Sequence, residues 1–327
     1  GMKGSSAEIA ELIGIPVVLV LNAKSTAYTV APVLYGFKHF YPGIRVVGVV
    51  FNFVASVAHY AYLQQACVDA GVEALGYIPK DESIVIPSRH LGLSIDETFC
   101  FDAFADRVAE VIDKTVNVDR LLELCTVEFS GEQTEGVICS GNRKIAIARD
   151  EAFNFMYREN VEALKRAGEV VFFSPLRDKR LPDADLVYFP GGYPELHLPE
   201  LAANEGMRQA VRKYCETGGR VLAECGGMMY LCDTITSDDG KVYPMAGVLK
   251  QGATMEQMKL KLGYREVRVN GQRIRGHEFH YSRILPANEK IPVIGTIYNA
   301  KDMVVDTPVY TYKNVLASYI HFYWGEC

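Results

Sequence analysis

The sequence predicts an α/β protein with two domains, each built around a mostly parallel sheet. Short continuous apolar runs recur along the chain, and such runs are typical of strands that are buried on both faces. In residues 1–115 these runs alternate with segments of helical spacing, which is the order of a parallel βαβ sheet. A length of 327 residues leaves room for two hydrophobic cores.

The first half of the chain supplies one such sheet, element by element. We expect strands where apolar runs stop at a polar or proline residue, at residues 16–21, 45–51 and 74–79. We expect helices at residues 29–40, 59–71 and 101–114. The second helix runs up to Gly71, and glycine favours the left-handed conformation in which many helices end.

A polar stretch separates this half from a second α/β unit. Residues 127–142 are rich in Ser, Gly and Glu, a composition that is typical of a linker. We therefore expect a first domain at residues 1–130, a linker at 131–142 and a second domain at 143–327. In the second domain we expect strands at 144–150, 170–173, 186–189 and 221–223, a helix at 153–167, and mostly strands from residue 242 onward.

Composition and charge narrow the function classes. The net charge of −6 argues against a nucleic-acid partner, and no run approaches the roughly 18 apolar residues of a membrane span. The eight cysteines contain no CxxC pair, so neither a zinc ribbon nor a disulfide framework is indicated. We expect a cytoplasmic protein whose thiols stay reduced.

The segment around Cys225 carries the strongest functional signal. Residues 221–223 are an apolar run, Cys225 and two glycines follow, and a helical pattern begins at Met228. A reactive side chain on a sharp turn between a strand and a helix is the arrangement called a nucleophile elbow. The free N–H groups at the start of the helix favour a thiolate and an oxyanion. The alternative is a buried structural cysteine beside a glycine turn.

Two more segments fit a cysteine nucleophile. The apolar strand at residues 186–189 runs into a Pro-Gly-Gly turn, whose backbone N–H groups can face a developing negative charge. An aromatic-rich strand expected at residues 317–324 contains one histidine, His321. A cysteine and a histidine that are distant in sequence can meet in the fold as nucleophile and base. A lone histidine in an apolar strand is more often structural, but three matching segments in this order favour the catalytic interpretation.

The chain resembles the cobyrinic acid a,c-diamide synthase family in motifs spread over nearly its whole length. The glutamine amidotransferase domain of that family is matched by the motifs PGGYPELH, ECGGMMYL, RGHEFHYS and ASYIHFYW. The synthetase domain is matched by GSSAEIAELIGIPVVLVLNA and LGYIPKDESIVIPSRHLGL. The resemblance implies a partial dethiobiotin-synthetase-like parallel-sheet domain followed by a class I glutamine amidotransferase-like α/β domain.

The resemblance also implies an activity, the ATP- and glutamine-dependent amidation of the a- and c-carboxylates of cobyrinate in cobalamin biosynthesis. Cys225 would attack the side-chain amide of glutamine, and His321 would take the thiol proton and return a proton to departing ammonia. Gly191, Gly192 and Gly226 would bind glutamine. The N–H groups of the last two would hold the oxyanion.

The third member of the catalytic site is not evident from the sequence. Many class I glutaminases orient the histidine with a glutamate two residues further on, and here that position is Tyr323. The resemblance implies that the segment with His277, Glu278, His280 and Tyr281 borders the domain interface and the glutaminase pocket. In a strand, His277 and Tyr281 lie on one face and Glu278 and His280 on the other, so the two histidines cannot share a metal ion without a bulge. The alternative is a purely structural role, and we expect no metal site.

In the synthetase half, Asn52 follows the strand at residues 45–51. By resemblance to the wider superfamily it would contact the adenine edge of ATP, and the alternative is an asparagine that closes a turn. The phosphate-binding P-loop, G-x-x-x-x-G-K-[ST], does not occur in the 327 residues. We therefore expect a chain that lacks the beginning of its synthetase domain, so that ATP and Mg²⁺ are cofactors of the intact enzyme.

Three interpretations stay open at this point. The chain is a glutamine-hydrolysing ligase or part of one, a truncated relative that binds a corrinoid or another partner without turnover, or a stand-alone glutaminase. The missing P-loop favours the second and third, whereas Cys225 and His321 favour an enzyme. The sequence does not distinguish cobyrinate from hydrogenobyrinate, or a monomer from a homodimer.

Overall fold

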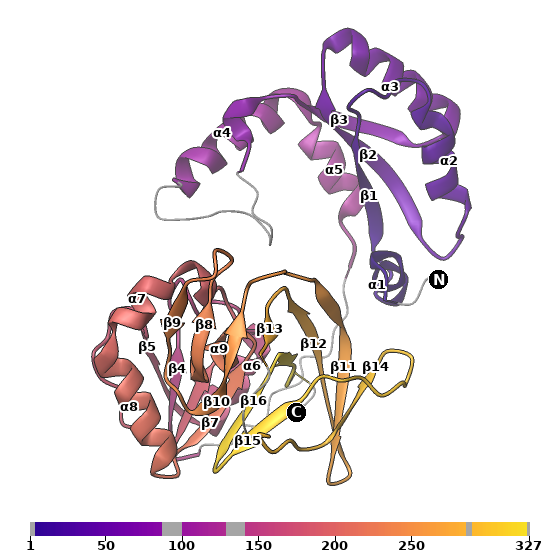
Figure 1. Ribbon diagram of the computed structural model, residues 1–327. Coiled ribbons are helices and arrows are strands. Elements are labelled where there is room, and N and C mark those ends of the chain that lie inside the picture. The colour runs from indigo at the N-terminus through magenta and orange to yellow at the C-terminus, as the bar shows by residue number, and fades with distance from the viewer. Residues whose placement is uncertain (1–3, 87–99, 129–140, 286–289, 326–327) are drawn as a thin grey trace. The chain divides into compact units, whose positions relative to one another are not determined.

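The computed structural model describes residues 4–86, 100–128, 141–285 and 290–325. The chain divides into two compact units, residues 1–133 and 134–327. The α/β class predicted from the sequence is confirmed, because helices flank parallel strands in both units (Figure 1). Most of the expected linker, residues 131–140, lies outside the described residues.

The first unit is a three-stranded parallel sheet in the order β1-β2-β3 with helices packed on it (Figure 1). Its elements are β1 (Pro16–Asn22), β2 (Arg45–Val54), β3 (Glu73–Pro79), α1 (Ser6–Leu12), α2 (Val30–His39), α3 (Val57–Ala70), α4 (Phe101–Thr115), α5 (Val118–Cys125) and the short 3-10 helix η1 (Glu82–Ile84). Helix α3 ends at Gly71, which takes the left-handed conformation at φ 66° as its sequence position predicts. The predicted elements are confirmed within a few residues, and α1 and α5 are additional to the prediction. The likeness to dethiobiotin synthetase stays a prediction.

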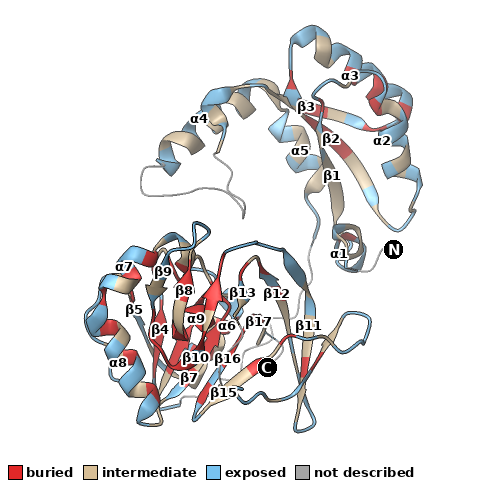
Figure 2. Ribbon diagram, in the orientation of Figure 1, coloured by how far each residue is buried: buried red, intermediate tan, exposed pale blue. Residues whose placement is uncertain are grey.

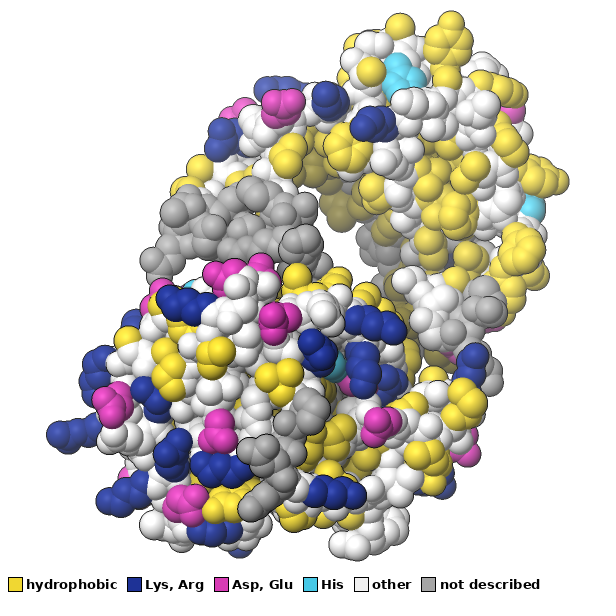
Figure 3. All heavy atoms as spheres, in the orientation of Figure 1, with side chains coloured by type: hydrophobic (Ala, Val, Ile, Leu, Met, Phe, Trp, Pro, Cys, Tyr) yellow, Lys and Arg dark blue, Asp and Glu magenta, His cyan; other side chains and the backbone are white. Residues whose placement is uncertain are grey.

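The core of the first unit lies between its sheet and helices α2 and α3. Phe51 of β2, Leu34 of α2 and Leu63 of α3 are fully buried there. Other large apolar side chains on the helices face outward, and Leu12 is 77% and Phe37 48% exposed. Figure 3 shows hydrophobic side chains gathered on the surface of this unit. The described residues thus leave an apolar surface uncovered.

The second unit is centred on a six-stranded sheet in the order β15-β16-β7-β6-β4-β5, parallel except for β15. Its strands are β4 (Arg143–Ala148), β5 (Gly168–Phe173), β6 (Leu186–Phe189), β7 (Arg220–Glu224), β15 (Val309–Tyr312) and β16 (Val315–Ser318). Its helices are α6 (Arg158–Ala167), which packs on one face, and α7 (Leu198–Ala203), α8 (Glu205–Glu216) and α9 (Gly226–Leu231), which pack on the other. Figure 2 shows buried residues along the central strands and α9.

Two four-stranded sheets complete the second unit, one in the order β14-β11-β12-β17 and the other in the order β13-β10-β8-β9. Their strands are β8 (Cys232–Thr236), β9 (Val242–Pro244), β10 (Leu249–Thr254), β11 (Lys261–Val269), β12 (Gln272–His280), β13 (Arg283–Ile284), β14 (Thr296–Asn299) and β17 (Ile320–Phe322). The prediction of mostly strands after residue 242 is confirmed. Across the described ranges of both units, no helix is long and apolar enough to cross a membrane.

The single strand expected at residues 317–324 is wrong. The chain breaks at Tyr319 into β16, which pairs with β7, and β17, which pairs with β12 in another sheet. The Ser318 hydroxyl accepts the N–H of Ile320 at 3.2 Å, and the Tyr319 ring stacks on His280 at 3.5 Å. These contacts turn the chain from one sheet into the other, so β17 lies beside the end of β7.

The helix expected at residues 153–167 begins only at Arg158. The side chain of Asp150 accepts backbone N–H groups of the following turn, and the Phe155 N–H donates to the Gly191 carbonyl. Such side-chain bonds compete with the first turn of a helix. The segment before α6 is therefore a loop that is bonded to the Pro-Gly-Gly turn.

Candidate active site

Cys225 lies at the sharp turn between β7 and α9. Its backbone has φ 46° and ψ −106°, a positive-φ conformation that is strained for a residue with a side chain. The Cys225 N–H donates to the Ser318 carbonyl at 2.7 Å, and the Cys225 carbonyl accepts the Met229 N–H at 3.0 Å. This is the geometry of a nucleophile elbow, which presents a reactive side chain at the end of a strand.

The Pro-Gly-Gly turn after β6 packs against this elbow. Gly192 has φ 155°, and a Cβ there would come within 2.2 Å of the Ala152 carbonyl oxygen, so only glycine fits. The Gly227 N–H donates to the Pro190 carbonyl at 3.1 Å and ties the turn to the start of α9. The Gly192 N–H is not used in the backbone hydrogen bonds of this described region, so it can hold an oxyanion, and the Gly226 N–H bonds the Cys225 thiol at the same turn.

His321 lies in β17 with a buried imidazole, 4% exposed. Its ring stacks on that of His277, with centroids 4.8 Å apart and 16° between the planes, and Phe155 meets it edge-on at 4.6 Å. The ring also lies against the backbone of Gly191, where a Cβ would come within 2.2 Å of Cε1. Its Nδ1 atom has no hydrogen-bond partner among the described residues. Packing on three sides therefore holds this imidazole.

The fold brings Cys225 and His321 to one site, although no hydrogen bond among the described residues joins them. The Cys225 sulfur lies 4.0 Å from the Phe279 carbonyl oxygen at the end of β12, the strand that pairs with β17. The turn that supports His321 also contacts the residue after Cys225, since a Cβ on Gly226 would lie 3.2 Å from the Gly192 nitrogen. Catalytic hydrogen bonds are often long before substrate binds, so this geometry fits a Cys–His pair.

Burial decides the protonation of both groups. It raises the pKa of the Cys225 thiol above its usual range, and the charge of Glu195 adds to this effect. Burial, with smaller contributions from His277 and His280, lowers the pKa of His321 to about 3. The resting pair is a neutral thiol and a neutral imidazole. The N–H of Gly226 at the helix start favours the thiolate, as the sequence predicts, but burial acts more strongly in the opposite direction.

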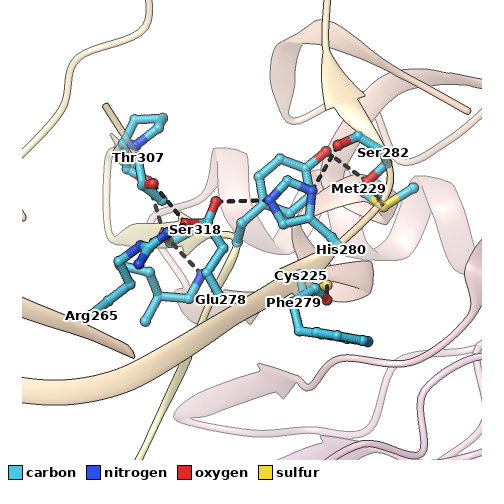
Figure 4. A network of polar contacts seen from close by, with 12 residues as sticks. Cys225, Met229, Arg265, Glu278, Phe279, His280, Ser282, Thr307 and Ser318 are labelled. Carbon is cyan, nitrogen blue, oxygen red and sulfur yellow. Dashed lines mark hydrogen bonds and ion pairs between the residues drawn. The ribbon is translucent and has the colours of Figure 1, made fainter. Parts of the chain in front are cut away.

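A polar network lies on the other face of β12 (Figure 4). The buried Glu278 carboxylate accepts from Arg265 Nε at 2.7 Å and Thr307 Oγ1 at 2.8 Å, and it pairs with His280 Nε2 at 2.8 Å. The other ring nitrogen of His280 lies 2.7 Å from the Ser282 carbonyl oxygen. Burial opposes the charged carboxylate, but the bonds from His280 and Thr307 and the charge of Arg265 outweigh it and lower the pKa of Glu278 to about 2. The network fixes β12 between β11 and the segment before β15.

Glu224, directly before the elbow, is a site residue that the sequence analysis missed. It is 1% exposed, and it accepts the Tyr188 hydroxyl at 2.8 Å and the Phe322 N–H at 3.2 Å. Burial raises the pKa of Glu224 to about 8. A glutamate at the end of an apolar strand was the available signal, because charged residues are rarely buried without a partner.

Tyr157 and Glu195 were also missed; Glu195 lies within the PGGYPELH motif, whereas the sequence carries no signal for Tyr157. The Tyr157 hydroxyl lies 2.7 Å from His277 Nδ1, which places Tyr157 behind the stacked histidines. Glu195 lies in the short 3-10 helix η2 (Pro194–Leu196) after the Pro-Gly-Gly turn, and burial raises its pKa to about 7. Only the folded chain brings Tyr157 to His277 and Glu195 within electrostatic range of Cys225.

Two further residues that the sequence predicted for the site, Tyr281 and Asn52, do not belong to the Cys–His pair. Tyr281 is partly buried against the main core of the second unit. Asn52 belongs to the first unit, where it lines a cavity of about 330 Å³ with mostly apolar neighbours, and its Oδ1 accepts the Phe53 N–H at 2.8 Å. No group of three or more His, Cys, Asp and Glu side chains in the described ranges is arranged to hold a metal ion.

Residues 144–326 match the family described as the CobB/CobQ-like glutamine amidotransferase domain. The cobyrinate a,c-diamide synthases of Caldanaerobacter subterraneus and Salmonella typhimurium are 37% and 33% identical to the chain over 98% of its length and 73% of theirs. The hydrogenobyrinate a,c-diamide synthase of Pseudomonas aeruginosa is 36% identical over 98% of this chain and 72% of its own. The chain therefore belongs to the cobyrinate a,c-diamide synthase family, and residues 144–326 are its glutamine amidotransferase domain.

Proposed function

We propose that the second unit hydrolyses L-glutamine with Cys225 as nucleophile and His321 as base. The observation that carries this proposal is the elbow at Cys225, whose positive φ fixes the thiol beside the turn on which the His321 ring rests. The N–H groups of Gly192 and Gly226 stabilise the oxyanion of the tetrahedral intermediate. Gly191 leaves room for the imidazole, because any side chain there would collide with it.

The reaction begins as the Cys225 sulfur attacks the side-chain amide carbon and the thiol proton moves to His321. His321 then gives this proton to the amide nitrogen, the C–N bond breaks, ammonia leaves, and the glutamyl group remains as a thioester on Cys225. Water then attacks the thioester as one of its protons passes to His321, the C–S bond breaks to release glutamate, and His321 returns the proton to the Cys225 sulfur. The imidazole of His321 is unprotonated near pH 7 and so has a free nitrogen for the thiol proton, although burial also makes it a weaker base.

Glu195 gives this site its preference for a free amino acid. Its charge raises the pKa of the Cys225 thiol, so Glu195 lies within electrostatic range of the sulfur, and with its own pKa raised to about 7 it ionises fully when a cation binds. The α-ammonium group of glutamine is the complementary cation. Pairing with Glu195 would anchor the backbone end of glutamine while its side-chain amide lies at Cys225.

The ammonia is used to amidate the a- and c-carboxylates of a corrinoid acid in cobalamin biosynthesis. Membership of the cobyrinate a,c-diamide synthase family supports this acceptor. The relatives include both a cobyrinate and a hydrogenobyrinate enzyme, so the substrate class is the a,c-dicarboxylate of such a corrinoid.

ATP, when bound to such a ligase, supplies the phosphoryl group that activates a carboxylate. The cavity beside Asn52 fits the base, because its walls are apolar and Asn52 and Asp81 provide a donor and an acceptor. The Phe53 N–H occupies Asn52 Oδ1, so the Asn52 amide N–H groups donate to a ring nitrogen of adenine. We assign no residue to the phosphates or to Mg²⁺, because the 327 residues contain no P-loop.

The setting that suits this chemistry is the cytoplasm. A reducing compartment protects a catalytic thiol from oxidation, and the cysteines of the described residues are all free. The exposed apolar side chains of α1 and α2 would be covered in a homodimer, which is the assembly we propose. Glutamine, the corrinoid acid and ATP are the small-molecule partners, and the net charge of −6 does not attract nucleic acid.

A glutamine-like diazo-ketone tests the nucleophile. It should alkylate Cys225 in preference to the other seven of the eight cysteines, as mapped by mass spectrometry after digestion. Cys225→Ser should abolish ammonia release from glutamine and leave the circular dichroism spectrum unchanged, since the replacement is nearly isosteric. Alkylation of Cys67 or Cys215 in place of Cys225, with activity retained in Cys225→Ser, would overturn the assignment.

A further inference from the structure

The base of this site has no hydrogen-bonded residue to orient it. In a catalytic triad a carboxylate holds the second ring nitrogen of the histidine. Here His321 Nδ1 is buried and unpartnered among the described residues. The position two residues on is Tyr323, whose N–H donates to the Arg275 carbonyl at 2.9 Å and whose ring meets the edge of Tyr157 at 5.3 Å. Neither of these contacts involves His321.

The sheet supplies another neighbour in register. The antiparallel pairing of β12 and β17 puts His277 directly opposite His321. Residues opposite each other share one face of the sheet and interact through their side chains. The two imidazoles are accordingly stacked at 4.8 Å and 16°. A slip of one residue would move His277 to the other face, so the stack depends on the register that the buried Glu278 helps to fix.

His277 is itself held in place. Its Nδ1 atom lies 2.7 Å from the Tyr157 hydroxyl, and Phe155 meets both stacked rings edge-on, at 5.6 Å for His277 and 4.6 Å for His321. Burial raises the pKa of Tyr157 and lowers that of His277. Tyr157 therefore stays protonated, and its hydroxyl donates a hydrogen bond to His277 Nδ1. His277 is then neutral and carries its own proton on Nε2.

Charge on the neighbours matters for a base that must gain a proton. The titratable groups around the stacked pair are Tyr157, Glu224, Tyr264, Glu278, His280 and Tyr323. His277 and His280 are the groups whose charge lowers the pKa of His321 further, after burial. A neutral His277 can stack on His321 without opposing the imidazolium that forms during the reaction.

We propose that His277 is a positioning residue for His321 and takes the place of the usual base-orienting glutamate. Its ring, fixed by Tyr157, holds the His321 imidazole by stacking at the angle needed to accept the Cys225 proton. The inference rests on the proposed glutamine hydrolysis. It differs from a triad in that aromatic contact, rather than a hydrogen bond to a carboxylate, orients the base.

Three variants of the full chain show whether the aromatic ring of His277 or its nitrogen atoms matter for activity. His277→Phe keeps the stacking ring, and His277→Ala removes it. Tyr264→Ala is the matched control, because Tyr264 is the 66% exposed partner of His277 on β11 and has no contact with His321 among those described. We expect His277→Ala to lower kcat for glutamine hydrolysis by about 10²-fold, the cost of a misplaced catalytic group, with a much smaller change in KM. His277→Phe should keep most of the activity, and Tyr264→Ala should match the unaltered protein.

The pH profile shows whether the effect passes through His321. Removing the ring lets water reach His321, and burial is the main cause of its lowered pKa, so the pKa of His321 should rise. The acidic limb of kcat/KM should then move to higher pH in His277→Ala and stay in place in His277→Phe. NMR titration of ¹⁵N-labelled histidines without substrate should show the same shift, independently of activity.

The outcomes separate this inference from the proposed function. If the unaltered chain releases no ammonia from glutamine, the proposed function is wrong. If it does, full kcat in His277→Ala overturns the positioning role, and equal losses in His277→Ala and His277→Phe show that a nitrogen of His277 is needed instead of its ring. Should His277→Ala fail to fold, His277→Phe decides, because a large loss of kcat in that variant contradicts the proposal.

Discussion

At the scale of single residues, two buried glutamates near the elbow have pKa values that are shifted in opposite directions. Glu224 is bonded by the Tyr188 hydroxyl and the Phe322 N–H, which are uncharged, so burial prevails and raises its pKa to about 8. Glu278 is equally buried, but hydrogen bonds and a guanidinium outweigh burial and lower its pKa to about 2. Glu224 therefore weakens the fold as pH rises from the unfolded value of about 4.3 toward 8, whereas Glu278 weakens it as pH falls below about 4.3.

Glu195→Gln tests the residue that we assign to the α-ammonium group. The amide keeps the shape of the side chain but removes the charge, so KM for glutamine should rise about 10²-fold, the effect of losing one partner of a buried ion pair. The kcat value should change little, because Glu195 does not take part in proton transfer. Steady-state ammonia release measures both constants. A fall in kcat with unchanged KM would place Glu195 in the chemistry instead of in binding.

At the scale of elements, the site depends on the passage from β16 to β17. Local sequence predicted the strands around it and the elbow at Cys225, because apolar runs and glycines carry those signals. The break at Tyr319 was not predictable, since residues 317–324 read as one apolar strand and the cause is a contact with His280, far away in sequence. The stacked His277 could be named as a candidate, but its partner emerges only from the pairing of β12 with β17.

Arg265→Met tests how strongly the polar network holds β12 in register. Arg265 and Glu278 are 11% and 0% exposed, so the substitution leaves a buried carboxylate without its cation. Removing one partner of such a pair costs about 3–5 kcal/mol of unfolding free energy. The pKa of Glu278 should rise toward its unfolded value, so the loss of stability that Glu278 contributes below about pH 4.3 should be smaller than in the unaltered protein. Urea unfolding at several pH values measures both effects, and Lys250→Met, at an exposed ion pair, is the control. Equal midpoints for the two variants at neutral pH would contradict this role.

At the scale of the whole molecule, the two units carry different parts of the proposed chemistry. The sequence predicted two α/β halves from the order of their strands and from the polar stretch between them, and the described chain divides at residue 133. The cavity beside Asn52 could not be predicted, because its walls come from β2, β3, η1 and α4, which only the fold assembles. Each unit has its own buried core, so a substitution in one site should leave the other intact.

Separate assays of the two sites test this independence. Asn52→Ala should weaken adenosine binding by roughly 5-fold, since about 1 kcal/mol is the net worth of one hydrogen bond, and should leave glutamine hydrolysis without nucleotide unchanged. Cys225→Ser should abolish hydrolysis and leave adenosine binding unchanged. Adenosine, AMP and ATP should bind with similar affinities, because the proposed contacts of this chain are to the base and its 327 residues contain no P-loop. Calorimetry with the three ligands measures this, and ATP binding that is much tighter than adenosine binding would reveal a phosphate site elsewhere in the chain.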